Sequence, residues 1–178
     1  DHEKLHGMDL PTNVYPLFAN SIRKSENKSA KTHLEECSDL FSEFSKVASN
    51  NPLSWFPTYR SKKEISEITP TNRMIGFPYN KYLNAVIRVN MSSAFILMSH
   101  SKAEELNIEK SKRVYVHSCS ILDDIWNVTQ RPNFHSSPAI KKCVNQALDK
   151  SEINLSDVEY FDLYSCLLYT SPSPRDPH

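Results

Sequence analysis

Glycine is scarce in this chain of 178 residues, and the scarcity limits the loops that the chain can build. The sequence holds 2 glycines, Gly7 and Gly76. Average usage of roughly 7% would give about a dozen. Phosphate-binding loops, dinucleotide-binding fingerprints and the nucleophile elbow of hydrolases all need closely spaced glycines. The sequence therefore contains none of these motifs, and any active site in it works without tight turns made of glycine.

The charges of the chain balance. Lys and Arg number 21, Asp and Glu number 21, and the formal net charge is +0. A nucleic-acid clamp or a polybasic membrane-surface module would be basic. No run approaches the roughly 18 apolar residues of a membrane-spanning helix. We therefore expect no nucleic-acid partner and no membrane span. Hydrophobic residues make up 39% of the chain, which is enough for the core of one domain.

The cysteines are spaced too widely for a zinc ribbon or a CxxC redox motif. Cys37 and Cys143 fall on apolar positions of predicted helices, where cysteine acts as a small core residue. His33 shares a helix face with Cys37, but a Cys–His nucleophile needs a third, orienting group. His117 and Cys119 lie two positions apart with no second pair of ligands, so we assign them to strand-end packing and expect no metal. The expected setting is reducing and cytoplasmic.

Apolar periodicity predicts several helices. Residues 12–24 form a short helix with Pro16 in its first turn, and residues 30–48 form a longer one capped by Ser29. Residues 52–84 are rich in proline and aromatic residues, and we predict loop structure there with one short helix near residues 62–68. Residues 138–150 form a helix with Ser137 as N-cap and a buried apolar stripe.

The second half of the chain alternates between strand-like and helix-like segments. Residues 91–99 (MSSAFILMS) are an apolar run of strand length, predicted to be buried on both faces. Residues 113–117 and 158–164 are also predicted strands, and residues 101–106 form a helical turn. This order favours an α/β layered domain. The proline-rich residues 167–178 break the pattern, and we interpret them as a disordered tail or as non-native sequence that resembles read-through from cloning DNA.

Several segments together resemble the thiolase superfamily, in particular its acetyl-CoA acetyltransferase-like and sterol-carrier-type branch. No one segment is a signature by itself, but their order and spacing match over about residues 1–166. The segments are residues 6–7 (HG) and 14–18 (VYPLF), 44–48 (FSKVA) with 51–52 (NP), 72–74 (NRM), 78–81 (PYNK), 84–85 (NA), 94–99 (AFILMS), 137–142 (SPAIKK) and 155–159 (LSDVE).

The resemblance implies an incomplete thiolase-like αβαβα layered fold. Residues 1–88 would be a segment of the loop domain, residues 89–166 the first part of the C-terminal domain, and the chain an internal fragment of a longer parent. The parent would be an acyltransferase acting on acyl-CoA thioesters, with coenzyme A as substrate and no covalently bound cofactor. It would be a homo-oligomer or pair with a small accessory domain.

Catalysis in the family uses a nucleophilic cysteine, a histidine and a second cysteine, and none of the three has a match in this sequence. Tyr164 stands where the family has the Asn or His that holds a water in the oxyanion site. Asn84 and Ala85 match the family's Asn-Ala-Ser segment near the pantetheine, with Val86 in place of the serine. Arg73 and Lys81 lie in the loop region that covers coenzyme A, where cations pair with phosphates.

Two alternatives to the acyltransferase hypothesis remain open. The departures at Tyr164, Val86 and Met91 motivate a non-catalytic, thiolase-like protein that binds coenzyme A or acts as a scaffold. A plain α/β interaction domain is the other alternative, and it would not bind coenzyme A.

Overall fold

The computed structural model describes residues 2–86, 90 and 92–163. Its α-helices are α1 (His2–Leu5), α2 (Pro11–Ser25), α3 (Ala30–Ser49), α4 (Lys62–Ser66), α5 (His100–Glu105) and α6 (Pro138–Ser151). Two strands, β1 (Met74–Gly76) and β2 (Tyr79–Asn80), form an antiparallel hairpin. Short 3-10 turns are η1 (Lys81–Leu83), η2 (Lys110–Lys112), η3 (Val128–Gln130) and η4 (Leu155–Asp157).

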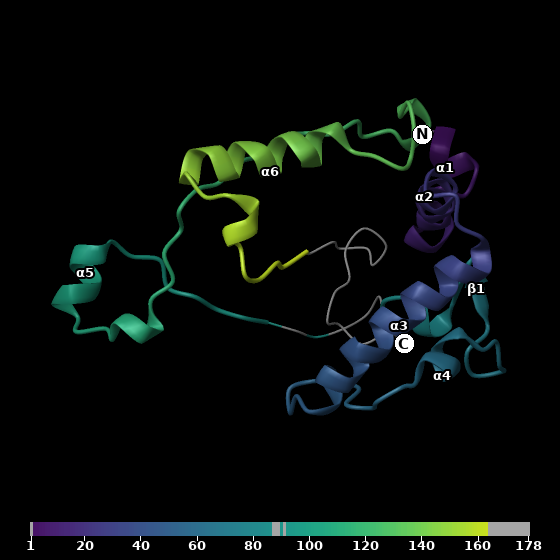
Figure 1. Cartoon of the computed structure of the whole chain (residues 1–178), viewed down its shortest axis with the longest axis horizontal. Helices are drawn as coiled ribbons and strands as arrows, with labels where there is room; N and C mark the ends of the chain where they lie inside the picture. The colour runs from purple at the N-terminus through teal and green to yellow at the C-terminus, as the bar shows by residue number, and fades with distance from the viewer. Residues whose placement is uncertain (1, 87–89, 91, 164–178) are drawn as a thin grey trace.

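The packed core lies in the first half of the chain, where α2, α3, α4 and the hairpin lie together (Figure 1). Its five buried residues are Ala19 of α2, Phe41 of α3, Ile65 of α4, Tyr79 of β2 and Leu83 of η1. Ile65 is 0% exposed, and full burial of such a side chain stabilises a fold by about 1.5–3 kcal/mol. This core fixes the position of the hairpin against the helices.

Helix α3 forms as the sequence predicts. The hydroxyl of Ser29 accepts a hydrogen bond from the backbone N–H of Thr32 at 3.0 Å, which caps the N-terminus. The buried face carries serines as well as apolar residues, and Ser42 and Ser45 both donate to the carbonyl oxygen of Arg60. Because serine is small, the chain that leads into α4 can lie directly against α3.

Helix α2 begins earlier than predicted. Pro11 occupies its first turn, so Pro16 lies inside the helix and not in the first turn. Gly76 of β1 lies directly against this helix. A Cβ built there would lie 2.6 Å from the Thr12 carbonyl oxygen and 3.0 Å from Pro16 Cγ. The absence of a Cβ therefore lets the hairpin approach the backbone of α2.

Buried asparagines hold the loop region between α4 and η1. The Asn72 amide nitrogen donates to the carbonyl oxygens of Glu64, Ile65 and Glu67 at 3.1, 3.0 and 2.8 Å, and its oxygen accepts from the Tyr82 N–H at 2.9 Å. Asn72 is 0% exposed. The stretch predicted as loop thus contains an ordered hairpin. The Asn72 side chain supplies the hydrogen-bond partners that these backbone N–H and C=O groups would find in a regular sheet.

The aromatic side chains of residues 52–84 are only partly buried. Tyr79 is buried and Tyr82 is half-buried, with Arg60 over its ring at 4.0 Å. The other aromatic side chains of this region are exposed: Trp55, Phe56, Tyr59 and Phe77.

The strand predictions for the second half are wrong for the described residues. Residues 92–99, 113–117 and 158–163 form no strand, and Phe95 and Val114 are 88% and 94% exposed. A strand needs a neighbour to pair its N–H and C=O groups, and the described residues contain only the two-stranded sheet β1–β2. The layered arrangement of the α/β prediction is therefore not formed by these residues.

Helix α6 begins where predicted, but its apolar stripe is not buried. Ser137 caps it by accepting from the Ile140 N–H, and Ile140 and Val144 are 60% and 45% exposed. Helix α6 packs on a single irregular segment. The Cys143 thiol donates a hydrogen bond to the Ser120 carbonyl oxygen of that segment at 2.9 Å. The domain division predicted at residues 88–89 and the predicted tail at 167–178 lie outside the described residues.

Candidate functional site

The four residues predicted to bind substrate line one pocket of about 270 Å³. We call it the Arg73 pocket. It is lined by Thr12, Pro70, Thr71, Arg73, Ile75, Lys81, Asn84 and Ala85. The predicted set of Arg73, Lys81, Asn84 and Ala85 is thus brought together in space. Whether these residues bind coenzyme A stays a prediction.

The β1–β2 hairpin brings the two cations of this pocket together. The backbone N–H of Lys81 donates to the carbonyl oxygen of Arg73 at 2.9 Å. Asn84 is buried, and its amide donates to the carbonyl oxygen of Asn80 at 2.6 Å. Backbone hydrogen bonds, rather than side-chain contacts, therefore set the spacing of the functional groups.

The Arg73 pocket is positively charged. No Asp or Glu lines it, and within residues 2–86, 90 and 92–163 neither Arg73 nor Lys81 forms an ion pair. Both side chains are exposed. The hydroxyl groups of Thr12 and Thr71 add neutral hydrogen-bonding groups. Such a set suits a ligand with negatively charged oxygens.

Tyr164, the predicted water-holding residue, lies outside the described residues, as does Cys166. Val86, which replaces the family's serine beside Asn84 and Ala85, is half-buried. The structure therefore leaves the catalytic assignment of Tyr164 as a prediction.

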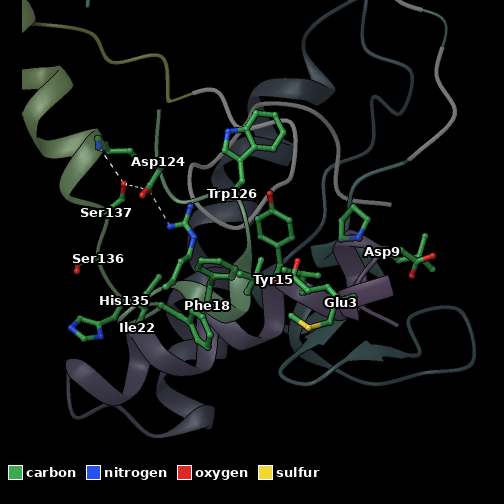
Figure 2. A pocket seen from close by; sticks show the side chains of 18 residues that line it. Glu3, Asp9, Tyr15, Phe18, Ile22, Asp124, Trp126, His135, Ser136 and Ser137 are labelled. Carbon is green, nitrogen blue, oxygen red and sulfur yellow. Dashed lines mark hydrogen bonds and ion pairs between the residues drawn. The ribbon is translucent and has the colours of Figure 1, made fainter. Parts of the chain in front are cut away.

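A larger pocket of about 610 Å³ lies between α2 and the segment that leads into α6 (Figure 2). We call it the aromatic pocket, because Tyr15, Phe18, Trp126 and Phe134 line it. Its walls also include Glu3, Met8, Asp9, Leu10, Pro11, Val14, Ile22, Asp124, Val128, Arg131, His135, Ser136, Ser137 and Ile140. Sequence reasoning missed this pocket, since no local motif links residues 3–22 to residues 124–140.

Asp124 organises one wall of the aromatic pocket. Its carboxylate accepts from the Ser137 hydroxyl at 2.6 Å and the Ile125 N–H at 2.8 Å, and it pairs with Arg131 at 3.0 Å (Figure 2). The hydrogen bond from Ser137, then that from the Ile125 N–H, then the Arg131 charge lower the pKa of Asp124 below its ordinary value of 3.8. This carboxylate is therefore ionised at neutral pH.

The other end of the pocket wall is tied to α1. The Glu3 carboxylate accepts from both the backbone N–H and the hydroxyl of Thr129, each at 2.8 Å. These two hydrogen bonds lower the pKa of Glu3. They join residues 126 positions apart in the sequence, so contacts between distant segments hold the two walls of the pocket together.

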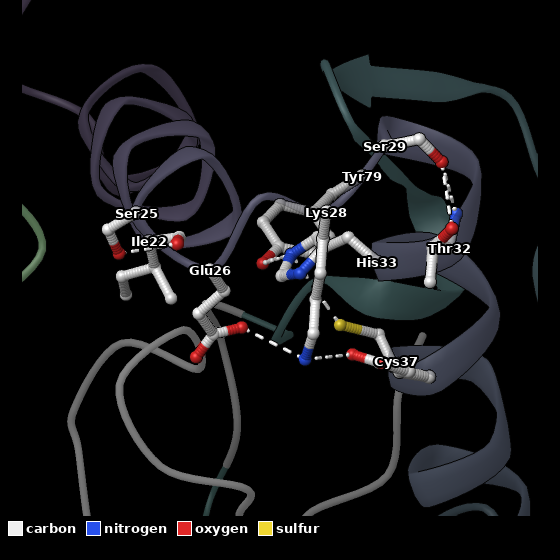
Figure 3. A network of polar contacts seen from close by, with 10 residues as sticks. Ile22, Ser25, Glu26, Lys28, Ser29, Thr32, His33, Cys37 and Tyr79 are labelled. Atoms are coloured by element: carbon white, nitrogen blue, oxygen red, sulfur yellow. Dashed lines mark hydrogen bonds and ion pairs between the residues drawn. The ribbon is translucent and has the colours of Figure 1, made fainter.

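His33 and Cys37 lie together, but their environment disfavours nucleophilic chemistry. The His33 ring nitrogen Nε2 lies 3.1 Å from the Tyr79 hydroxyl and 3.7 Å from Cys37 Sγ (Figure 3). Burial raises the pKa of the Cys37 thiol to about 11 and lowers the pKa of His33. A thiol with so high a pKa stays protonated at neutral pH and is a poor nucleophile. Cys37 packs against the core, as predicted.

The salt bridge beside this pair is part of the turn between α2 and α3. Lys28 Nζ pairs with Glu36 at 2.7 Å and Glu26 at 2.9 Å (Figure 3). These hydrogen bonds raise the pKa of Lys28. The network therefore fixes the helix–helix connection and presents no free catalytic group.

His117 and Cys119 are both exposed. In the part of the chain that the structure describes, no three His, Cys, Asp or Glu residues lie together in a group that could hold a metal ion. The same residues include no helix with the length and apolar character needed to cross a bilayer.

The comparisons with known proteins give a match among solved structures. No protein-family model matches the sequence, and no curated protein matches it. Among solved structures, the chain is similar to a monomeric SCP2-thiolase-like protein type 1 from Mycobacterium smegmatis, with 30% sequence identity and a TM-score of 0.79. The match covers 96% of this chain and 37% of that one. The chain therefore has a thiolase-like fold, corresponding to part of the length of that protein.

Proposed function

We propose that this chain forms the coenzyme A-binding part of a thiolase-like acyltransferase that acts on acyl-CoA thioesters. One observation carries the proposal: Arg73, Lys81, Asn84 and Ala85, assigned by resemblance to the family, line one pocket that contains no carboxylate. The likeness to an SCP2-thiolase-like protein supports it independently.

The chemistry of the Arg73 pocket fits the phosphates of coenzyme A. A guanidinium binds phosphate through two parallel hydrogen bonds, and an ammonium adds a point charge. At about 270 Å³ the pocket is slightly smaller than the roughly 300–1,000 Å³ of pockets that enclose a whole drug-sized ligand. It is therefore suited to one phosphate-bearing end of the cofactor.

The chain's own described residues contribute binding rather than covalent chemistry in this proposal. Cys37 is kept as a thiol by burial, and the Cys143 thiol donates a hydrogen bond to the Ser120 carbonyl oxygen. Neither is placed to take an acyl group, and the exposed Cys119 does not line the Arg73 pocket. Val86 and Tyr164 replace residues that the family uses near the substrate. If these replacements abolish acyl transfer, the parent would bind coenzyme A without catalysing a reaction.

The test is calorimetric titration of the 178-residue chain with coenzyme A and with dephospho-coenzyme A. A charge-assisted hydrogen bond contributes about 1.5–3 kcal/mol, so Arg73→Gln and Lys81→Gln should each weaken coenzyme A binding by about tenfold or more. Lys63→Gln is the matched control, because Lys63 is exposed and does not line the pocket. Equal affinities for the three variants, or no binding by the unmodified chain, would contradict the proposal.

Assembly is a separate part of the proposal. Resemblance to the thiolases predicts a homo-oligomeric parent, whereas the SCP2-thiolase-like protein from Mycobacterium smegmatis is described as monomeric. Light scattering behind a sizing column, at two protein concentrations, measures the state of this chain directly.

A further inference from the structure

Four aromatic side chains line one cavity, the aromatic pocket, and one of them keeps most of its surface accessible. The volume of about 610 Å³ falls within the roughly 300–1,000 Å³ typical of small-molecule sites. Phe18 and Phe134 contact each other, with ring centroids 5.4 Å apart. Trp126 lines the same cavity and is 88% exposed. Phe18 and Phe134 therefore cover each other in part, whereas the Trp126 indole is available to a ligand.

The contact between Arg131 and Phe18 shows that the wall of this pocket accepts a cation. The Arg131 guanidinium lies 5.6 Å from the centre of the Phe18 ring, within the roughly 6 Å over which the face of an aromatic ring attracts positive charge. The same guanidinium pairs with Asp124 at 3.0 Å. The chain thus supplies its own cation to Phe18, and indole is the aromatic group that attracts cations most strongly.

Carboxylates outnumber cations among the described residues that line the aromatic pocket. The carboxylates belong to Glu3, Asp9 and Asp124, and Arg131 is the one Lys or Arg in this set. Arg131 pairs with Asp124. Asp9 is exposed and forms no ion pair in the part of the chain that the structure describes. An anionic ligand would be repelled here, whereas a cationic ligand would gain attraction.

We propose that the aromatic pocket binds an organic cation of the quaternary ammonium class. The methyl groups of the ligand lie against the Trp126 indole, and Asp9 attracts its charge. In the view of Figure 2, Trp126 lies between Asp9 and Asp124, so the indole has a carboxylate on either side. A quaternary ammonium has no N–H group, so it gives up no hydrogen bond when it leaves water for an apolar wall.

This site differs from the Arg73 pocket in position and in charge. The two pockets have no lining residue in common. The Arg73 pocket has two cations and no carboxylate, whereas the aromatic pocket has more carboxylates than cations. The proposal therefore stands whether or not the chain binds coenzyme A.

Charge is tested with two ligands of the same shape. Choline and 3,3-dimethylbutan-1-ol share a hydroxyethyl arm and three methyl groups, and differ in that a quaternary nitrogen of choline replaces a carbon atom. Each is titrated calorimetrically into the 178-residue chain at low ionic strength, where the attraction of exposed charges is least screened. Choline should bind saturably, and the alcohol at least about tenfold more weakly, equal to about 1.4 kcal/mol.

Two substitutions test the ring and the carboxylate separately. Trp126→Leu keeps an apolar side chain but removes the indole, and it should weaken choline binding by about threefold or more. Its control is Trp55→Leu, because Trp55 is also exposed and does not line the pocket. Asp9→Asn removes the charge and keeps the shape, and it should weaken choline binding by about twofold or more. Its control is Asp149→Asn, an exposed position outside the pocket.

Three results would overturn the proposal: no saturable heat with choline, equal affinity for choline and the alcohol, or a choline affinity that Trp126→Leu or Asp9→Asn leaves at the level of its control. If either variant fails to fold by far-ultraviolet circular dichroism, the comparison of choline with the alcohol in the unmodified chain still decides. Arg73→Gln should leave the choline affinity unchanged, so failure here is distinguishable from failure of the Arg73 pocket to bind coenzyme A.

Discussion

Truncating Asn72 to alanine tests the buried asparagine that organises the hairpin. The substitution removes the acceptor of the Tyr82 N–H at 2.9 Å and the donor to the Glu64 and Glu67 carbonyl oxygens at 3.1 and 2.8 Å. The Ile65 carbonyl keeps a second donor, Asn80, at 2.6 Å. One fully orphaned buried N–H costs about 1–3 kcal/mol. The substitution also leaves an unfilled space and removes a donor from the Glu64 and Glu67 carbonyl oxygens. We therefore expect the free energy of unfolding to fall by about 3 kcal/mol.

Urea unfolding measures this fall in stability. Far-ultraviolet circular dichroism is a suitable signal because it reports on the helices that pack on the hairpin. A loss of about 3 kcal/mol is a large part of the roughly 5–15 kcal/mol that stabilises a typical domain. Asn50→Ala is the control: Asn50 is exposed and donates one hydrogen bond, to Lys46 at 3.0 Å, so it should cost about 0.5 kcal/mol. A loss for Asn72→Ala that equals the control would refute the reasoning.

The remaining predictions concern close packing, thiol chemistry and helix capping. Gly76→Ala should destabilise the chain by about 1–3 kcal/mol, since the new Cβ would meet the Thr12 carbonyl oxygen at 2.6 Å; an unchanged urea midpoint would argue against that approach. Iodoacetamide at neutral pH should modify exposed Cys119 well before Cys37, whose pKa burial raises to about 11; equal labelling rates by peptide mass spectrometry would be inconsistent with this burial. Because the folded state favours the protonated Cys37 thiol, its contribution to stability is present below about pH 9 and falls as pH rises toward about 11. Ser137→Ala should cost about 1 kcal/mol by removing the cap of α6, and Ser137→Thr, which keeps a hydroxyl, should recover most of it in the same unfolding assay.

Helix ends were predictable because their signals are local. Ser29 and Ser137 cap their helices as the sequence indicates, since an N-cap interaction joins residues three apart. Helix α2 begins at Pro11, one residue before the predicted start, and Pro16 therefore lies in the helix interior and not in its first turn.

Strands and pockets were harder to predict because they depend on distant partners. Residues 92–99 have the composition of a buried strand, but composition cannot supply the neighbouring strand that pairing requires. Arg73 and Lys81 were predicted to bind coenzyme A from resemblance to a family. Their proximity depends on the β1–β2 hairpin, which lies in a proline-rich stretch predicted as loop. The aromatic pocket gave no sequence signal, since its two walls are more than 100 positions apart in the chain.

The proline inside α2 has a consequence for local opening. Pro16 has no N–H, so it cannot donate to the carbonyl oxygen of Thr12, four residues before it. That same carbonyl faces Gly76 of β1, and Thr12 lines the Arg73 pocket. The ladder of backbone hydrogen bonds in α2 therefore lacks one bond at the turn that lies against the hairpin. Amide hydrogen exchange along α2 should accordingly slow when the pocket is filled, which makes this turn an internal reporter of occupancy.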